Sequence, residues 1–127
     1  ISINPDDARG YAGMAYAHLL KRNTDMSLKY FNSAIECDPQ YTDAFYNIAS
    51  IYIGKDDYNQ AIKYLNMAMD FAPSEAKLHY MAGLVCYKEE KKEEALREFK
   101  IYMTLAPYGE HGEEVKTIIE KIEKEKK

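Results

Sequence analysis

The fold is decided by residues 38–73, whose sequence is DPQYTDAFYNIASIYIGKDDYNQAIKYLNMAMDFAP. A proline stands near each end of this stretch. Between the two prolines, apolar residues recur at spacings of three and four, the period of an amphipathic α-helix. The polar turn Gly54-Lys55-Asp56-Asp57 interrupts the pattern near its middle, and Asp57 resembles an N-cap for the helix after it. The stretch therefore predicts two helices, over residues 41–54 and 58–71, joined by a short turn.

The same unit recurs along the chain. The four prolines stand at Pro5, Pro39, Pro73 and Pro107, each 34 residues after the one before. Proline lacks an amide proton and is disfavoured inside a helix, so a fixed proline period marks one junction that repeats. The flanking windows predict helices over residues 7–21 with 24–37 and over residues 75–89 with 92–105. Their short polar connections require antiparallel neighbours.

These units resemble the tetratricopeptide repeat family, whose pattern is W-x2-L-G-x2-Y, then A-x3-F, then P. The first, usually aromatic position is held by Tyr11, Phe45 and His79; in the second helix the small position is held by Ser27, Ala61 and Ala95, and the large apolar one by Phe31, Leu65 and Phe99. The resemblance spans residues 8–109. It implies an all-α fold, a right-handed α–α superhelix (a solenoid) of antiparallel helix pairs.

The repeats are expected at residues 8–41, 42–75 and 76–109, after a tail of a preceding repeat at residues 1–7. Small residues at Ala15, Ala49 and Gly83 are expected to let the two helices of each pair approach closely. Tyr102 stands where earlier repeats have Ala34 and Ala68, which indicates that the array ends there.

Residues 110–127 depart from the pattern. They carry one narrow apolar stripe, made of Val115, Ile118, Ile119 and Ile122. Such a stripe predicts a C-terminal helix that caps the last repeat. The alternative is an amphipathic helix that binds a partner.

Stacked helix pairs present a concave face lined by their first helices, and such faces bind other proteins. The resemblance therefore implies a protein-interaction scaffold that binds a peptide or helical segment of a partner. Carried onto this sequence, the family's groove positions are Arg9, Ala12, Tyr16, Leu19, Asp43, Tyr46, Asn47, Ser50, Ile53, Lys77, Tyr80, Leu84 and Tyr87. Tyr16, Tyr46 and Tyr80 would offer apolar rings tipped with hydroxyl groups. The alternative is that these tyrosines only pack helices together.

Some members of the family hold the C-terminal carboxylate of heat-shock chaperones in a clamp of Lys, Asn, Asn, Lys and Arg. Here the clamp positions hold Ala12, Tyr16, Asn47, Tyr80 and Leu84, so only Asn47 matches. A carboxylate needs charged or paired donors to offset its desolvation, and this set supplies almost none. An apolar or aromatic segment is therefore the expected ligand, and a chaperone tail is disfavoured.

Composition and motifs argue against other classes of function. A net charge of −4 gives no basic face for nucleic acid, and no apolar run approaches the roughly 18 residues needed for membrane insertion. The three histidines and two cysteines lack metal-ligand spacing, and no phosphate-binding or nucleophile motif occurs. His79 sits at a packing position of the repeat, where a structural role is expected. We expect no enzyme activity, no metal and no cofactor.

Two further interpretations stay open. The module could self-associate weakly through exposed repeat ends or through its closing helix, or it could be a structural module of a larger multidomain protein. Two reduced thiols favour a cytoplasmic location. A periplasmic or exported protein is the alternative if a signal peptide was removed.

Overall fold

The computed structural model describes residues 5–126, and every regular element in that span is an α-helix. The helices are α1 (Pro5–Leu20), α2 (Thr24–Cys37), α3 (Thr42–Gly54), α4 (Tyr58–Phe71), α5 (Ala76–Lys88), α6 (Lys92–Leu105) and α7 (Gly112–Glu125). The six helices predicted for the repeats are confirmed, with ends that differ by at most two residues. Most of the predicted tail of a preceding repeat, residues 1–4, lies outside the described residues.

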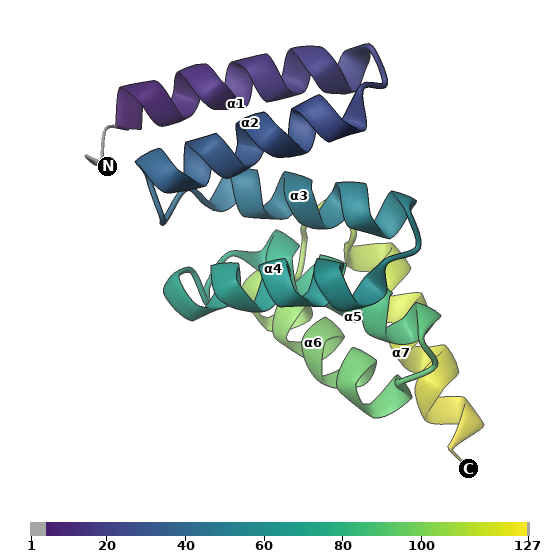
Figure 1. The fold of residues 1–127 in the computed structure, drawn as a ribbon. Coiled ribbons are helices and arrows are strands. Elements are labelled where there is room, and N and C mark those ends of the chain that lie inside the picture. The colour runs from purple at the N-terminus through teal and green to yellow at the C-terminus, as the bar shows by residue number, and fades with distance from the viewer. Residues whose placement is uncertain (1–4, 127) are drawn as a thin grey trace. The chain divides into compact units, whose positions relative to one another are not determined.

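The chain divides into two compact units, Ile1–Phe71 and Ala72–Lys127. In the first unit α1 packs on α2, α2 on α3 and α3 on α4, so that successive helices lie side by side (Figure 1). In the second unit α5 packs on α6, and α6 packs on α7. Within each unit, helices therefore contact their neighbours in the sequence, as the short connections require.

The turn inside each helix pair is built the same way three times. Arg22, Asp56 and Glu90 are 34 residues apart, and each has a left-handed backbone, with φ of 60°, 59° and 62°. The amide of the following residue donates to a carbonyl five positions back, as in Asn23 to His18 at 2.8 Å and Lys91 to Cys86 at 2.9 Å. This pattern closes a helix C-terminus and reverses the chain.

Capping residues then start the second helix of the first two pairs. The Asp57 carboxylate accepts a hydrogen bond from the Gln60 amide at 3.2 Å, which confirms its predicted capping role. The Asn23 side chain accepts from the Met26 amide at 3.4 Å. The turns thus satisfy amide groups that a helix start leaves without partners.

The core of the first unit packs three alanines of α1 against large and small residues of α2 and α3. Ala8, Ala12 and Ala15 of α1 are buried with Phe31 and Ala34 of α2. The Ser27 hydroxyl, at the small position of α2, donates to the Ala15 carbonyl at 3.0 Å. A buried hydroxyl is tolerated here because it is hydrogen-bonded.

In the second unit α5 and α6 approach each other closely at a glycine. A Cβ added at Gly83 would lie 2.5 Å from the ring of Phe99, so even alanine would force the ring to move. The predicted role of Gly83 in close packing is therefore confirmed. Nearby, His79 is buried, and its two ring nitrogens lie 2.7 Å from the Glu98 carboxylate and 2.7 Å from the Pro73 carbonyl oxygen. His79 has the packing role expected from the sequence.

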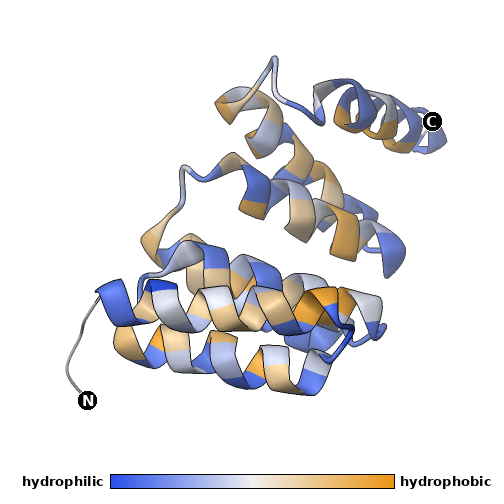
Figure 2. Cartoon of the chain, turned by 90° about the horizontal axis from the view of Figure 1, so that it is seen from above, coloured by the Kyte–Doolittle hydropathy of each residue, from blue (hydrophilic) through white to orange (hydrophobic). Residues whose placement is uncertain are grey.

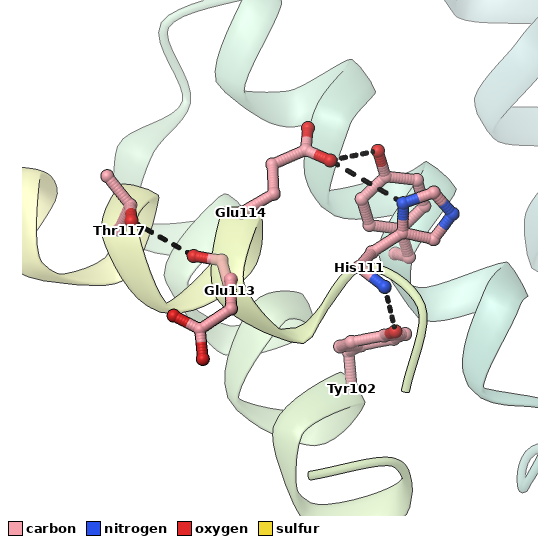
Figure 3. Close-up of polar contacts among 6 residues, drawn as sticks. Tyr102, His111, Glu113, Glu114 and Thr117 are labelled. Carbon is pink, nitrogen blue, oxygen red and sulfur yellow. Dashed lines mark hydrogen bonds and ion pairs between the residues drawn. The ribbon is translucent and has the colours of Figure 1, made fainter. Parts of the chain in front are cut away.

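Helix α7 packs on α6 through its narrow apolar stripe, which Figure 2 shows as orange patches on an otherwise hydrophilic helix. Val115 and Ile122 are fully buried. The Tyr102 hydroxyl accepts a hydrogen bond from the His111 amide at 3.0 Å, just before α7 begins (Figure 3). Tyr102 thus anchors the start of α7, at a position where the earlier repeats carry alanine.

Candidate functional site

The predicted groove residues of the first unit differ in how far solvent reaches them. Arg9, Tyr16, Asp43 and Ser50 are exposed or partly exposed, and Leu19, Tyr46, Asn47 and Ile53 are half-buried. Ala12 is only 1% exposed and belongs to the core cluster, so it offers a ligand no surface. Arg9 forms an exposed ion pair with Asp6 one turn before it.

The centre of this set is a hydrogen-bonded link between α1 and α3. The Asn47 amide nitrogen donates to the Tyr16 hydroxyl at 2.8 Å and to the Asp43 carbonyl oxygen at 2.7 Å. The Tyr16 ring meets Phe31 edge-on, with centroids 5.3 Å apart. Both N–H bonds of the amide are engaged, which fixes the plane of the Asn47 side chain. Its Oδ1 is the polar atom that neither bond uses.

A hollow of about 330 Å³ opens beside this link, between the C-terminal ends of α1 and α3 and the start of α2. Its lining residues are Leu19, Thr24, Asn47, Ser50, Ile51, Gly54 and Lys55. Leu19 and Ile51 are apolar, whereas Thr24, Asn47, Ser50 and Lys55 can form hydrogen bonds. A wall that mixes apolar and polar groups in this way suits a short segment of polypeptide.

Three of the predicted groove residues, Leu19, Asn47 and Ser50, line this hollow together. The groove prediction from the sequence missed the other four lining residues: Thr24 begins α2, Ile51 and Gly54 belong to α3, and Lys55 lies in the turn after α3. Lys55 was recognised as a turn residue, and the 34-residue register pairs it with Lys21 in the preceding turn. That register is the available signal for the turn residues, whereas the predicted groove positions were confined to the first helix of each repeat.

A lysine marks the rim of the hollow. The Lys55 ammonium lies 3.6 Å from the Asp25 carboxylate, and the Asp25 side chain is almost fully exposed. An exposed pair of this kind contributes little to stability and can exchange one partner for another. Lys55 is therefore available to a carbonyl or carboxylate group of a ligand.

In the second unit the predicted residues lie in a different environment. Lys77, Leu84 and Tyr87 are half-buried. Tyr80 is only 7% exposed: its hydroxyl donates to the Glu114 carboxylate at 2.8 Å, and its ring stacks on His111 at 3.9 Å between centroids. Figure 3 shows how Glu114 and His111, from α7 and the loop before it, converge at this place. The Tyr80 surface is taken up by the chain's own C-terminal helix.

The described residues contain no group of three or more His, Cys, Asp or Glu side chains placed to hold a metal ion. Among residues 5–126, no helix is both long and apolar enough to cross a membrane. Both cysteines are free thiols. Burial is the largest cause that raises the pKa of the Cys86 thiol, and the carboxylates of Glu94 and Glu98 act in the same direction. Cys86 therefore stays protonated at neutral pH, a poor nucleophile.

Several solved structures share the fold. The first tetratricopeptide repeat domain of Spaghetti (RPAP3), bound to an HSP90 peptide, is 19% identical, with a TM-score of 0.85 over 96% of this chain and 94% of that one. The Yersinia enterocolitica secretion chaperone SycD, in complex with a peptide of the translocator YopD, is 15% identical, with a TM-score of 0.87 over 98% of each chain. The second such domain of human RPAP3, in complex with an HSP70 peptide, is 19% identical, with a TM-score of 0.81 over 94% of this chain and 98% of that one.

At these identities the likeness is one of fold, and it confirms the predicted all-α repeat architecture. No curated protein sequence matches the chain significantly. Two models of the family described as tetratricopeptide repeat match the sequence, one over residues 8–41 and one over residues 30–63. Together with the repeated helix pairs and their turns 34 residues apart, these matches identify residues 8–63 as tetratricopeptide repeats.

Proposed function

We propose that this chain is a protein-interaction scaffold that binds a peptide segment of a partner in the hollow beside Asn47. The observation that carries the proposal is the convergence of Leu19, Asn47 and Ser50 on one hollow of about 330 Å³. These residues come from two first helices, α1 and α3, which present the binding face in arrays of this kind. The other predicted groove residues, apart from the buried Ala12 and Tyr80, remain candidates for further contacts with a partner.

The hollow has the chemistry to hold a peptide backbone and one apolar side chain. Leu19 and Ile51 supply apolar surface for the side chain. The Asn47 Oδ1 can accept from a backbone amide, and the Ser50 hydroxyl can donate to a backbone carbonyl. Because Tyr16 and Asp43 already fix the Asn47 side chain, binding does not have to order it. We therefore expect an extended or helical segment with an apolar or aromatic anchor.

The peptides bound in the similar structures support a peptide as the ligand. The residues of this chain favour an apolar peptide over an acidic one. Two of those structures hold peptides of HSP90 and HSP70. At the five clamp positions named above, this chain has only Asn47, while Ala12 and Tyr80 are buried. Lys55 adds one cation at the rim, which is too little to hold an acidic tail on its own. An apolar segment is therefore the proposed ligand.

The sharpest test first selects peptides that bind the chain and then removes the Asn47 side-chain amide. A phage-displayed library of random peptides would be panned on the chain, and the selected peptides measured by fluorescence anisotropy. Asn47→Ala is expected to weaken binding about tenfold, the effect of one lost hydrogen bond with a preorganised group. Asn66→Ala is the matched control, because Asn66 is an exposed asparagine on α4, outside the hollow.

A second variant tests the hollow itself. Ser50→Trp fills it from an exposed position on α3, so the fold should be kept while the space is lost. Binding should fall to the background seen with an unrelated peptide, with unchanged circular dichroism. Selected peptides that bind Asn47→Ala, Ser50→Trp and the parent equally would refute the site.

We propose repeats at residues 8–41, 42–75 and 76–109 and a cap at residues 110–127. We also propose an adaptor role without catalysis. A cytoplasmic location fits the free thiols of Cys37 and Cys86, since such thiols persist in a reducing compartment.

A further inference from the structure

One face of helix α1 belongs neither to the buried core nor to the predicted groove. Gly10, Gly13, Met14 and Ala17 are all exposed, and Met14 is 46% and Tyr11 37% accessible. A Cβ added at Gly10 or Gly13 would meet no atom within 4 Å. Asp6, Asp7, Gly10, Tyr11 and Met14 line a hollow of about 320 Å³ on this face. The groove residues Arg9, Tyr16 and Leu19 lie on another side of the helix by their spacing.

The 34-residue register indicates that this face has the pattern of a helix-packing surface. Its equivalents in α3 are Ala44 for Gly10, Phe45 for Tyr11, Ile48 for Met14 and Ile51 for Ala17. In α3 all four are buried, and Ala44, Ile48 and Ile51 share a core cluster with Phe31 and Ala34 of α2. The same face of α1 therefore corresponds to a helix-packing surface. Tyr30 of α2 stacks on the Tyr11 ring at its edge, whereas Met14 remains 46% exposed.

The pattern along this face is complementary to itself. Asp7, Gly10, Met14, Ala17 and Lys21 follow one another at spacings of three and four, so they form one stripe that runs through α1 and into the turn after it. The stripe consists of an acid, a small residue, a methionine, a small residue and a base, with Met14 at its centre. Two such stripes laid antiparallel place Met14 opposite Met14, and each Asp7 opposite a Lys21. Parallel stripes would instead bring like charges together.

We propose that two copies of this chain associate through α1, antiparallel, around a two-fold axis at Met14. Small residues at positions 10 and 17 let the two helices approach closely, and the ion pairs at both ends set their direction. The hollow beside Gly10 lies at the level of Ala17 and of the aliphatic part of Lys21 in the second copy. Such a pair leaves the proposed peptide site free, because that site lies on another side of α1.

Sedimentation equilibrium of the whole chain from about 5 µM to about 1 mM, the range in which weak pairs form, tests the proposal with charge reversals as probes. Asp7→Lys alone and Lys21→Asp alone each place like charges opposite each other twice in the pair. Either change should weaken association about tenfold. The double variant Asp7→Lys with Lys21→Asp should restore it. An equimolar mixture of the two single variants should form a heterodimer, because both of its end contacts are again attractive.

A methionine substitution provides the matched control. Met14→Glu places two carboxylates at the axis and should abolish association. Met67→Glu makes the same change at a similarly exposed methionine on α4 and should leave association unchanged. Circular dichroism would verify that each variant is folded. A chain that stays monomeric at the highest concentration overturns the proposal, as does a pair that survives Met14→Glu or that the double reversal fails to restore.

Discussion

At the scale of single residues, the three turn positions with a left-handed backbone hold residues other than glycine. Glu90 has φ of 62° without being a glycine, and a residue with a Cβ loses roughly 1–2 kcal/mol in this conformation. Glu90→Gly removes that cost and increases the entropy of the unfolded chain, which offsets part of the gain. We expect a net increase of about 0.5–1 kcal/mol in the free energy of unfolding, measured by urea denaturation.

The residue before it supplies the control for this prediction. Glu89 has φ of −87° and ψ of 7°, a conformation that any residue adopts without strain. Glu89→Gly therefore gives only the entropic penalty and should lower stability. If both glycine variants are destabilised to the same extent, the left-handed conformation of Glu90 is not strained and the prediction is wrong.

Two features of single residues could not be predicted from the sequence: the left-handed turns and the exposure of the groove positions. The period of the prolines placed all three turns correctly, but Arg22, Asp56 and Glu90 lack the glycine that usually signals a left-handed position. In the site, Ala12, Tyr46 and Tyr80 occupy one register position, yet Ala12 and Tyr80 are buried and Tyr46 is half-buried. The register fixes which way a side chain points. Its exposure depends on the neighbouring helix, as His111 and Glu114 show at Tyr80.

At the scale of elements, α7 is fastened to α6 by ion pairs as well as by its apolar stripe. The Lys92 ammonium lies 2.6 Å from the Glu125 carboxylate, and Lys126 lies 2.7 Å from Glu93. The hydrogen bond from Lys92 is the largest cause that lowers the pKa of the Glu125 carboxyl, and the same bond raises the pKa of Lys92. Both groups are charged at neutral pH, so the pair stabilises the folded state there.

The direction of these shifts predicts the effect of pH on this pair. Because the folded-state pKa of Glu125 is lowered, its contribution is present above the unfolded-state value of about 4.3 and is lost as the pH falls through the folded value. The raised pKa of Lys92 gives the mirror image, with loss as the pH rises through that value. Thermal melts should therefore show a small advantage of the parent over Glu125→Gln at neutral pH, which disappears in acid.

Added salt distinguishes the electrostatic contribution of this ion pair from other effects of Glu125→Gln. The pair is exposed, so about 1 M sodium chloride should screen it and remove the difference between the parent and Glu125→Gln at neutral pH. Glu120→Gln is a control, since Glu120 is an exposed glutamate on the same helix for which no ion pair is found among the described residues. A difference that persists in acid and in salt would contradict an electrostatic origin.

At the scale of the whole molecule, the repeat makes stability depend on how many neighbours a helix has. In an array of this kind, stability is approximately a sum over repeats and over the interfaces between them. Helix α3 packs between α2 and α4, whereas α1 packs on α2 and leaves its outer face exposed. The buried Phe45 and Ile48 of α3 correspond to the exposed Tyr11 and Met14 of α1. The first helix should therefore open more readily than the third.

Hydrogen exchange measured by mass spectrometry checks this gradient. In dilute solution, peptides from α1 should exchange about tenfold faster than peptides from α3, after correction for intrinsic rates, because local opening there exposes less apolar surface. If two copies pair through α1, raising the protein concentration should slow exchange in α1 and leave α3 unchanged. Met14→Glu should remove that concentration dependence. Equal protection of α1 and α3 in dilute solution would show that the exposed outer face of α1 does not lower the local stability of this helix.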